Sequence, residues 1–476
     1  SKNKGLRMKP VRTWRKNWKY PTSILCIYGF FSTIKPMEPF LVPYLTGPDK
    51  NLTAQQVNNE IFPVWTYSFL AVQVPVFLLT DWLRYKPIVI LQCMALFITM
   101  ATIRWVTNVP GMQVSQFFFG VATASDLGYY SYIYSMVDLN KYRKATSYIR
   151  SVQLLGYSVG SVLGQLLFSL ELLSYNDALV FTLILIAIAL LVSFFLPMPQ
   201  RSMFFHRKRK LTGDFQGEER SEESEEAGVK TEDHQELAEA QTCGKVLLQM
   251  IRDFRECFAS KQLLYWSLWW VMASCGFNQT VNFIQVLWEH VQPSQNSSIY
   301  NGGVEAVSST ASVYGIGYRE ERWEQWGELA LAGFSGLCSV ALFVMTFSSN
   351  IWISYASYIV FKCLYMVLMT IAMFHIATEL TMERYALVFG ANTFGALVLQ
   401  TILTSIVVDS GGLALGIIPQ FIVYASYFSL ITAVFLLRGL YTIRREKKNS
   451  QLPLPSLSLP YQHKTSNIIA QKIIVF

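Results

Sequence analysis

Charged residues are scarce in this chain of 476 residues. Asp, Glu, Lys and Arg together make up only 15% of it, whereas hydrophobic residues make up 52%. A soluble domain usually carries about 25% charged residues, and the mean hydropathy here is +0.31. These values exclude an ordinary soluble protein and predict a chain whose solvent is the lipid bilayer.

Cysteines and catalytic motifs are also scarce. Seven cysteines occur, none in CxxC spacing, and each lies in an apolar run or in the polar middle of the chain. Zinc sites, redox sites and disulfides are therefore not expected. The HExxH pattern and the phosphate-cradling glycine loop, both signs of catalysis, are missing. We predict a protein that is not an enzyme and that uses no metal or cofactor.

The basic residues mark membrane topology. The net charge of +8 would also suit nucleic-acid binding. However, Lys and Arg gather between the apolar runs, with eight of them in residues 1–20. This bias is typical of cytosolic loops, so we expect a multi-pass plasma-membrane protein with both termini cytosolic and no nucleic-acid partner. Glycosylation sequons begin at Asn51 and Asn296, in loops expected outside.

Long apolar runs dominate the rest of the chain. A helix needs about 20 apolar residues to cross a bilayer, and about twelve such runs occur. They begin near Pro21, Phe62, Pro87, Met112, Ser147, Ala178, Leu263, Ser298, Leu329, Ile351, Tyr385 and Ile417. The Glu-rich stretch Leu211–Thr242 separates the sixth from the seventh, and its composition is typical of disorder.

The runs therefore form two groups of six. We predict an all-α membrane protein, a major-facilitator-type bundle of about twelve transmembrane helices in two six-helix halves. In this architecture the substrate binds near the midplane between the halves. The expected parts are a cytosolic N-terminal segment (1–20), the N-terminal half (21–198), a cytosolic, largely disordered linker (199–262), the C-terminal half (263–441) and a cytosolic tail (442–476).

Ionisable residues inside the runs are costly in a bilayer, so each needs a function or a partner. Glu38 lies between two prolines that interrupt the first helix. It is either a carboxylate facing a central cavity or one neutralised by Lys35. Asp126, midway along the fourth run, either binds a cation or relays a proton, or it pairs with a base such as Arg150.

Two further charged groups leave similar alternatives open. Glu305 and Lys362, in the eighth and tenth runs, form either a proton relay or a mutually neutralised pair. Asp81 and Arg84 lie in a short cytosolic turn that resembles the gating motif of major-facilitator carriers. The alternative for this turn is ordinary positive charge on the inner side.

Aromatic residues make up 14% of the chain. Their faces stack on flat rings and attract cations, but Trp and Tyr also gather in belts at membrane interfaces. Trp65 and Tyr157 are the better candidates for a binding site, because neither lies at the end of a run.

Several stretches together resemble one family, the reduced-folate and thiamine carriers. The resemblance covers nearly all of Tyr20–Tyr441 except the linker. The stretches that carry it are Lys35–Phe40, Gly47–Thr53, Asn59–Tyr67, Phe195–Pro199, Tyr300–Ala306 and Glu383–Gly390. It implies a carrier of a small water-soluble vitamin that works by alternating access, with proton-linked exchange.

The thiamine branch is the closer of the two by this resemblance. Asp126 and Gln400 stand where the folate branch has basic residues, and thiamine carries a fixed cation. The resemblance implies that Glu38 holds the aminopyrimidine ring with help from Asn282. It also implies roles for the other cavity residues, with rings packed by Phe62, Trp65 and Tyr157 and support from Glu305.

The chain departs from the thiamine carriers on one face of the fourth run. Gln116 replaces a glutamate that faces the cationic ring, and Phe119 replaces a tyrosine. The eighth run, Val304–Tyr318, is a few residues shorter than the family pattern. These departures leave open weaker thiamine binding, a shift to pyridoxine or a folate, and a non-transporting membrane receptor or paralogue.

Overall fold

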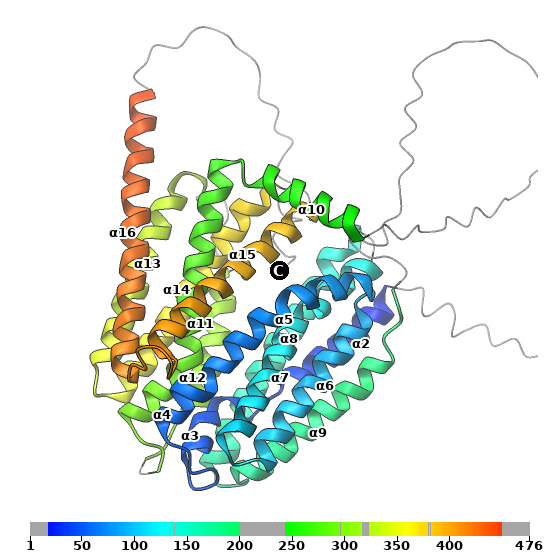
Figure 1. Cartoon of the computed structure of the whole chain (residues 1–476), viewed down its shortest axis with the longest axis vertical. Coiled ribbons are helices and arrows are strands. Elements are labelled where there is room, and N and C mark those ends of the chain that lie inside the picture. Colours follow the sequence, from blue (N-terminus) through cyan, green and yellow to red (C-terminus); the bar gives the residue numbers. More distant parts are fainter. Residues whose placement is uncertain are drawn as a thin grey trace, which may run out of the picture.

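The computed structural model describes residues 18–137, 139–199, 243–295, 297–316, 323–378, 380 and 382–449. Within these ranges the chain is built of helices and contains no strand. Helices of the N-terminal part lie side by side in one bundle, and helices of the C-terminal part form a second bundle against it (Figure 1). The predicted all-α class is confirmed.

The first bundle is interrupted near Pro36 and Pro39, as predicted from the sequence. Its long helices are α2 (Lys19–Thr33), α5 (Phe62–Trp82), α6 (Lys86–Trp105), α7 (Val109–Met136), α8 (Leu139–Ser169) and α9 (Tyr175–Phe194). Between α2 and α5 lie the 3-10 turn η1 (Glu38–Phe40), α3 (Leu41–Thr46), α4 (Ala54–Gln56) and the π-helix η2 (Val57–Ile61). Residues 34–37 are therefore non-helical inside the first predicted span.

The second bundle repeats this plan. Its long helices are α11 (Lys261–Val291), α12 (Asn301–Ile316), α13 (Trp323–Phe347), α14 (Ile351–Thr378), α15 (Met382–Leu403) and α16 (Ile417–Asn449). A second π-helix, η4 (Thr404–Val408), continues α15. Helix α12 has 16 residues, and the predicted end of its run at Tyr318 lies outside the described residues.

The predicted starts lie close to the observed helices, with one larger shift. Helix α8 begins at Leu139 rather than near Ser147, because its polar first turns continue the helix beyond the apolar run. Helix α16 likewise reaches Asn449, past the expected boundary at residue 441.

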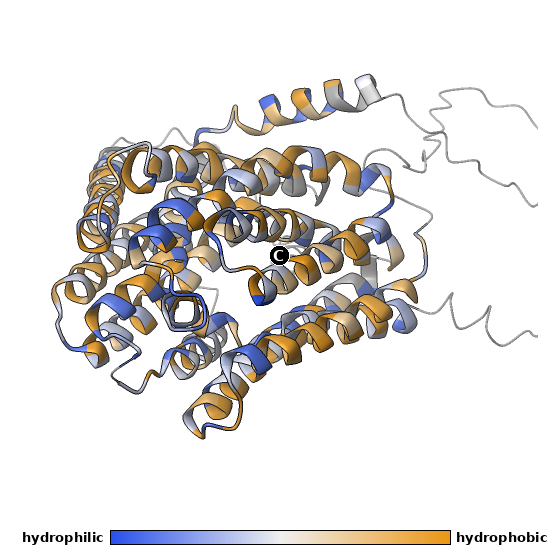
Figure 2. Ribbon diagram, turned by 60° about the horizontal axis from the view of Figure 1, so that its bottom comes forward, coloured by the Kyte–Doolittle hydropathy of each residue, from blue (hydrophilic) through white to orange (hydrophobic). Residues whose placement is uncertain are grey.

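Within the described ranges, seven helical segments are long and apolar enough to cross a membrane. They are Ala54–Trp82, Lys86–Trp105, Lys144–Ser169, Tyr175–Phe194, Ile351–Met373, Leu387–Val408 and Ile417–Thr442. Hydrophobic residues colour much of the helical ribbon in Figure 2. Other long helices, such as α7 and α11, carry polar residues like Gln116 and Asn278 that line internal cavities. This lowers their mean hydropathy.

Helix α10 (Cys243–Cys257) lies across the ends of the bundle helices (Figure 1). Arg384, at the start of α15, forms ion pairs with Asp253 at 3.5 Å and with Glu256 at 2.6 Å. This helix falls in the segment predicted to be largely disordered, and residues 200–242 of that segment lie outside the described residues. The charged side of α10 is thus anchored to the second bundle.

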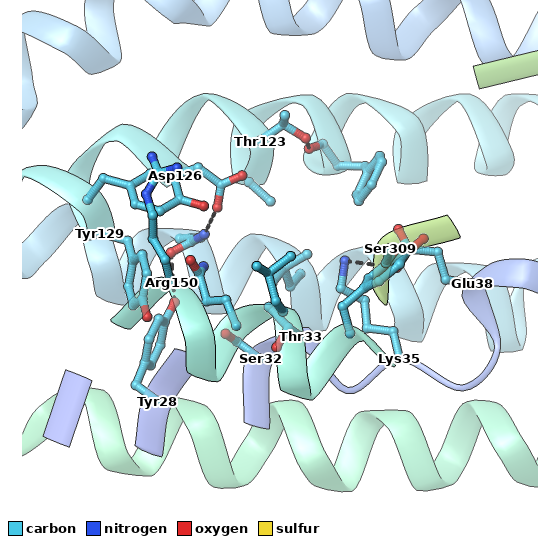
Figure 3. Close-up of a pocket in the computed structure, with 18 of the residues that line it drawn as sticks. Tyr28, Ser32, Thr33, Lys35, Glu38, Thr123, Asp126, Tyr129, Arg150 and Ser309 are labelled. Carbon is cyan, nitrogen blue, oxygen red and sulfur yellow. Dashed lines mark hydrogen bonds and ion pairs between the residues drawn. The ribbon is translucent and has the colours of Figure 1, made fainter. Parts of the chain in front are cut away.

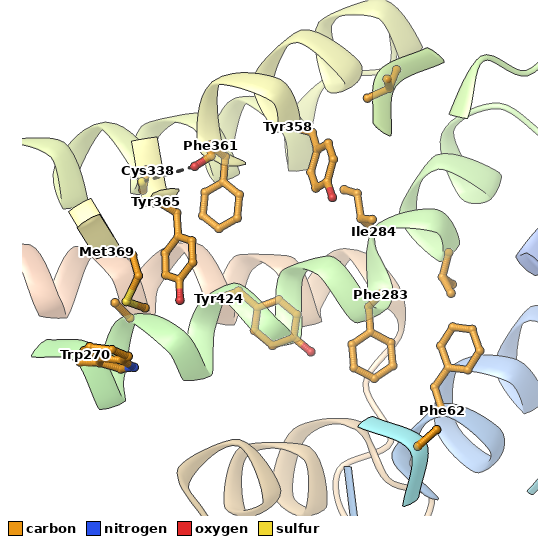
Figure 4. Packing of buried hydrophobic residues seen from close by; sticks show 14 of the residues in the cluster. Phe62, Trp270, Phe283, Ile284, Cys338, Tyr358, Phe361, Tyr365, Met369 and Tyr424 are labelled. Carbon is orange, nitrogen blue, oxygen red and sulfur yellow. Dashed lines mark hydrogen bonds between the residues drawn. The ribbon is translucent and has the colours of Figure 1, made fainter. Parts of the chain in front are cut away.

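The two bundles meet along two helix pairs, α8 with α12 and α5 with α15. Aromatic side chains fill the interior of the second bundle and reach the first (Figure 4). Phe277 stacks on Tyr365 with 3.8 Å between ring centroids, and Phe283 lies 6.0 Å from Phe62 of α5. The similar solved structures described below confirm the major-facilitator-type architecture.

Candidate substrate site

The break after α2 places a Lys and a Glu at the centre of the molecule. Lys35 Nζ lies 3.4 Å from Glu38 Oε2, with 14% and 32% of the two side chains exposed. Lys35 Nζ also lies 5.5 Å from the centroid of the Phe119 ring. The pairing with Lys35 that the sequence left open for Glu38 is present, but the carboxylate keeps an exposed side.

Three glycines of α8 hold this break in place. A Cβ at Gly156 would lie 2.8 Å from Phe30 O, one at Gly160 2.8 Å from Lys35 N, and one at Gly164 2.2 Å from Pro36 O. Backbone therefore contacts backbone along this face of α8. The glycines also create a G-x-S-x-G pattern at residues 156–160. It lies inside a helix rather than at a strand-to-helix elbow, so it is no sign of catalysis.

A cavity of about 250 Å³ lies between the halves beside Glu38. Every residue predicted to bind substrate lines it. They are Glu38, Phe62, Trp65, Gln116, Phe119, Tyr157, Asn282 and Glu305. These side chains come from the α2–α3 break, α5, α7, α8, α11 and α12, so both halves contribute. The structure brings the set together, and the role of each residue stays a prediction.

Aromatic rings form the walls near Glu38. Trp65 and Phe119 lie 6.2 Å apart, and Trp65 Nε1 donates a hydrogen bond of 3.2 Å to Thr123 Oγ1. This bond fixes one edge of the indole. Aromatic faces attract cations, so both rings could contact a cationic ring in the cavity.

A second cavity, of about 510 Å³, continues from the first and shares Glu38, Trp65, Phe119 and Tyr157 as lining residues. Asp126, Arg150 and Lys362, the predicted coupling or structural charges, all line it. Figure 3 shows Lys35 and Glu38 toward one end of this cavity and Asp126 with Arg150 toward the other. The two groups of charges are thus separated along one continuous space.

Glu305 is the most tightly held acid of the site. Lys362 Nζ lies 2.6 Å from Glu305 Oε2, and the side chains are only 9% and 8% exposed. Tyr157 donates to the same oxygen at 2.9 Å, and Tyr358 donates to Oε1 at 2.8 Å. The mutually neutralised pair that the sequence left open is present, and both carboxylate oxygens are occupied.

Asp126 accepts a short hydrogen bond from Gln92 Nε2. Arg150 lies over the Tyr130 ring at 5.1 Å. Asp126 and Arg150 line the same cavity.

One amide donor of the site has no partner among the described residues. Asn282 Nδ2 is buried and makes no hydrogen bond there. A buried unsatisfied donor is costly, so this group is suited to a ligand acceptor such as a ring nitrogen. Asn282 was assigned a binding role by resemblance alone.

Some lining residues were not predicted. Asn278 and Gln285 of α11 line the smaller cavity, and Gln92 of α6 lines the larger one. Each is a neutral amide inside an apolar run, and a search for ionisable residues passes over it. Polar amides at this depth are themselves a signal of cavity lining.

Hydrogen bonds between the halves seal the end of the bundle near α3 and α4. The π-helices η2 and η4 meet here, where Asn59 Nδ2 donates to Val408 O and, at 3.4 Å, to Leu415 O. Tyr67 OH donates to Asp409 Oδ2 at 2.5 Å. Single π-turns are rare and frequently mark functional sites.

A second part of this seal lies directly against the break after α2. Gln285 Nε2 donates to Glu38 O at 3.0 Å, and Asn301 Nδ2 donates to Pro39 O at 3.1 Å. The backbone that carries Glu38 is thus fixed by side chains of the opposite half. A movement of the halves apart at this end would release it.

The remaining predicted residues lie away from the cavities. In the turn after α5, Asp81 accepts a hydrogen bond of 2.8 Å from Tyr85 OH, and Arg84 has a positive φ of 59°. Asn51 is exposed in the loop after α3. Asn296 lies outside the described residues. The gating and glycosylation roles stay predictions.

Comparison with known proteins gives a consistent family. The family model described as "Reduced folate carrier" matches residues 16–423. Thiamine transporter 2 of Homo sapiens is 47% identical over 95% of this chain and 97% of its own length. Thiamine transporter 1 of Homo sapiens is 46% identical over 94% and 95%. The reduced folate transporter of Homo sapiens is 36% identical over 96% and 78%.

Solved transporter structures share the fold at low identity. A POT family transporter aligns with a TM-score of 0.61 and 10% identity, covering 87% of this chain and 95% of its own. The nucleoside transporter NupG aligns with a TM-score of 0.59 and 14% identity, covering 88% and 99%. At such identities the likeness concerns the arrangement of helices alone.

Proposed function

Because this chain belongs to the reduced folate carrier family, we propose that it carries a thiamine-like vitamin across the plasma membrane. In this proposal both termini face the cytosol and the sealed end near α3 and α4 faces outside. The sequence relatives named as thiamine transporters support this substrate class, since they align along almost the whole chain at 46–47% identity.

The observation that carries the proposal is the environment of Glu38. Among the three acids of the cavities, Glu305 has both oxygens occupied and Asp126 is bound by Gln92. Glu38 retains 32% exposure beside the rings of Trp65 and Phe119. A carboxylate next to aromatic faces is a site suited to a cationic aromatic ring.

The mechanism follows from the position of the seal. Substrate entering from outside requires the bonds of Asn59, Tyr67 and Gln285 across the halves to break. Substrate leaving toward the cytosol requires that they re-form. The two halves thus rock around the midplane cavity, and the α8–α12 and α5–α15 contacts are the surfaces on which they move.

We assign proton coupling to Glu38 or Asp126, because both line the larger cavity and lie in the same continuous space. A carboxylate that exchanges its proton during the cycle makes uptake depend on pH. Uptake measured between about pH 5.5 and 8 should therefore depend on pH. Uptake that stays constant over this range would remove the coupling assignment.

The deciding experiment is uptake of labelled thiamine, and separately of pyridoxine, by cells expressing the chain or its Gln116→Glu variant. Thiamine uptake by the unmodified chain supports the proposal and shows that Glu38 and the aromatic rings suffice. Uptake by the variant alone would make Gln116 the specificity switch and direct the search to less cationic vitamins. Binding without uptake in sealed vesicles would instead identify a receptor-like paralogue.

A folate is the second candidate substrate, favoured by Lys35, Arg150 and Lys362 in the larger cavity. Two of these three cations are paired with Glu38 and Glu305, which leaves little net positive charge for a dicarboxylate. A higher affinity for folates than for thiamine in the same cells would reverse this ranking.

A further inference from the structure

Helix α10 carries an apolar stripe that faces away from the rest of the protein. Its members are Leu248, which is 60% exposed, Ile251, which is 64% exposed, and Phe254, which is 41% exposed. They follow one another at intervals of three residues, so they share one side of the helix. Large apolar side chains are normally shielded from water, and the described part of the chain leaves most of this stripe uncovered.

The opposite side of α10 is held by the second bundle. Cys257 is only 4% exposed, and α10 contacts α15. Asp253 and Glu256, the two acids of this helix, form ion pairs with Arg384 of α15 at 3.5 Å and 2.6 Å. The negative charges of α10 are therefore bound to the bundle.

The arginines of α10 accompany the apolar stripe instead. Arg252 and Arg255 are exposed. With 3.6 residues per turn, Arg255 lies between Leu248 and Ile251 around the helix, and Arg252 lies on the other side of Leu248. Apolar and basic side chains on one exposed face are typical of helices that lie in the surface of an anionic membrane.

Helix α10 also lies at the depth where the membrane spans begin. It is at the end of the molecule opposite the seal (Figure 1). Arg384, to which it is bound, comes three residues before the membrane-crossing segment Leu387–Val408. Only three residues separate Cys257 from the start of α11 at Lys261. The exposed face of α10 is therefore within reach of lipid headgroups.

We propose that α10 lies on the membrane leaflet at this end, the cytosolic one in the proposed orientation, and binds anionic phospholipid there. The apolar stripe enters the boundary between headgroups and acyl chains, and Arg252 and Arg255 bind the lipid phosphate and carboxylate groups. The inference goes beyond the proposed function, because it holds whichever vitamin is carried. Since Arg384 ties α10 to α15, the lipid contact reaches one of the helices at which the halves meet.

The test is hydrogen exchange of the purified full-length carrier in lipid nanodiscs. One sample contains phosphatidylcholine alone, and the other contains phosphatidylcholine mixed with phosphatidylserine. We expect the backbone amides of residues 248–256 to exchange at least about tenfold more slowly in the anionic lipid. One basic residue at an anionic surface changes a binding equilibrium about fivefold, and here two act together.

The double variant Arg252→Gln, Arg255→Gln should exchange equally fast in the two lipids. Its matched control is Lys141→Gln, Arg444→Gln, which removes two exposed bases from α8 and α16 and should keep the full difference. Thermal unfolding of each chain verifies that it is folded.

The stripe is tested by the double variant Leu248→Ser, Ile251→Ser, which should exchange faster than the unmodified chain in both lipids. Equal exchange of the unmodified chain in the two lipids overturns the proposal. A lipid difference that survives in Arg252→Gln, Arg255→Gln also overturns it. Protection that ignores lipid charge but grows when two copies share a nanodisc would instead identify a second copy of the chain as the cover of the stripe.

Discussion

The two halves of the molecule each place one Lys–Glu pair in the central space, and the two pairs differ in almost every physical respect. In the C-terminal half, Lys362 and Glu305 lie 2.6 Å apart and are 9% and 8% exposed. In the N-terminal half, Lys35 and Glu38 lie 3.4 Å apart and are 14% and 32% exposed. The first pair joins two regular helices, and the second lies in a helix break.

The difference shows that the same two residue types perform different tasks in different surroundings. Two tyrosines and Lys362 bind the Glu305 carboxylate, so that each of its oxygens already has a partner. The Glu38 carboxylate has one ionic partner and an exposed side. We therefore expect the C-terminal pair to act as a fixed structural element and the N-terminal pair to be available for exchange.

Removing one member of the C-terminal pair should have the largest effect. Glu305→Gln leaves Lys362 as a buried cation without its counter-charge, which destabilises a protein by about 3–5 kcal/mol. We expect a lower Tm of the purified carrier and less protein at the cell surface. The double variant Glu305→Gln, Lys362→Met should recover most of the loss. Equal losses in the single and double variants would contradict the assignment of a structural pair.

Removing the acid of the N-terminal pair should affect substrate rather than folding. Glu38→Gln deletes a charge-assisted contact worth roughly 2 kcal/mol, or about a 30-fold weaker thiamine affinity. The partly exposed position should keep the Tm close to that of the unmodified chain. Binding and thermal unfolding measured on the same sample check both parts. A large fall in Tm with unchanged affinity would show that the N-terminal pair has a structural role rather than a substrate-binding role.

Removing the aromatic neighbour of the N-terminal pair should have a smaller effect. Phe119→Leu deletes a cation–π contact of roughly 0.5–1 kcal/mol, so the Kd for thiamine should rise about two- to fivefold. Phe117→Leu is a matched control two residues away, since that ring is 43% exposed and does not line either cavity. Equal effects of the two substitutions would rule out a role for the Phe119 ring face.

A substitution at Asn51, remote from both pairs, should have the smallest effect on transport. Asn51 is exposed in the loop after α3, on the side of the seal that we place outside. Asn51→Gln should abolish a glycan, seen as a shift on a gel after glycosidase treatment, and leave thiamine uptake unchanged. An unglycosylated Asn51 in the unmodified chain, expressed in cells that glycosylate other proteins, would count against this orientation.

The helix content and its order could be predicted from the sequence, because apolar runs of sufficient length have few alternatives in a membrane. The interruption of the first span followed from the prolines around Glu38. The start of α8 and the end of α16 could not be predicted. In both places polar residues extend the helix beyond the apolar run from which its bounds were predicted. The π-helices were also invisible, because residues 57–61 and 404–408 have no composition that distinguishes them from α-helix.

The sequence alone singled out Glu38, Glu305, Trp65 and Tyr157, and the resemblance added the other residues of the site. The structure then showed which of its charges are paired. From the sequence, Glu38 and Glu305 could each be either a functional acid of the cavity or an acid neutralised by a lysine. Composition cannot distinguish these two alternatives. The choice depends on distances, such as that of Tyr358 to Glu305, between residues that lie far apart in the chain. Neutral amides such as Gln92 and Gln285 were missed because they carry no charge to explain.

The glycine stripe of α8 bears on how inherited changes in this chain should be interpreted. Gly156, Gly160 and Gly164 are not lining residues of either cavity. A side chain would nevertheless collide with Phe30 O at Gly156, with Lys35 N at Gly160 and with Pro36 O at Gly164. Judged by its chemistry alone, Gly160→Ala is a mild substitution. The geometry predicts a larger effect, because one methyl group at Gly160 would displace the backbone at Lys35, three residues before Glu38.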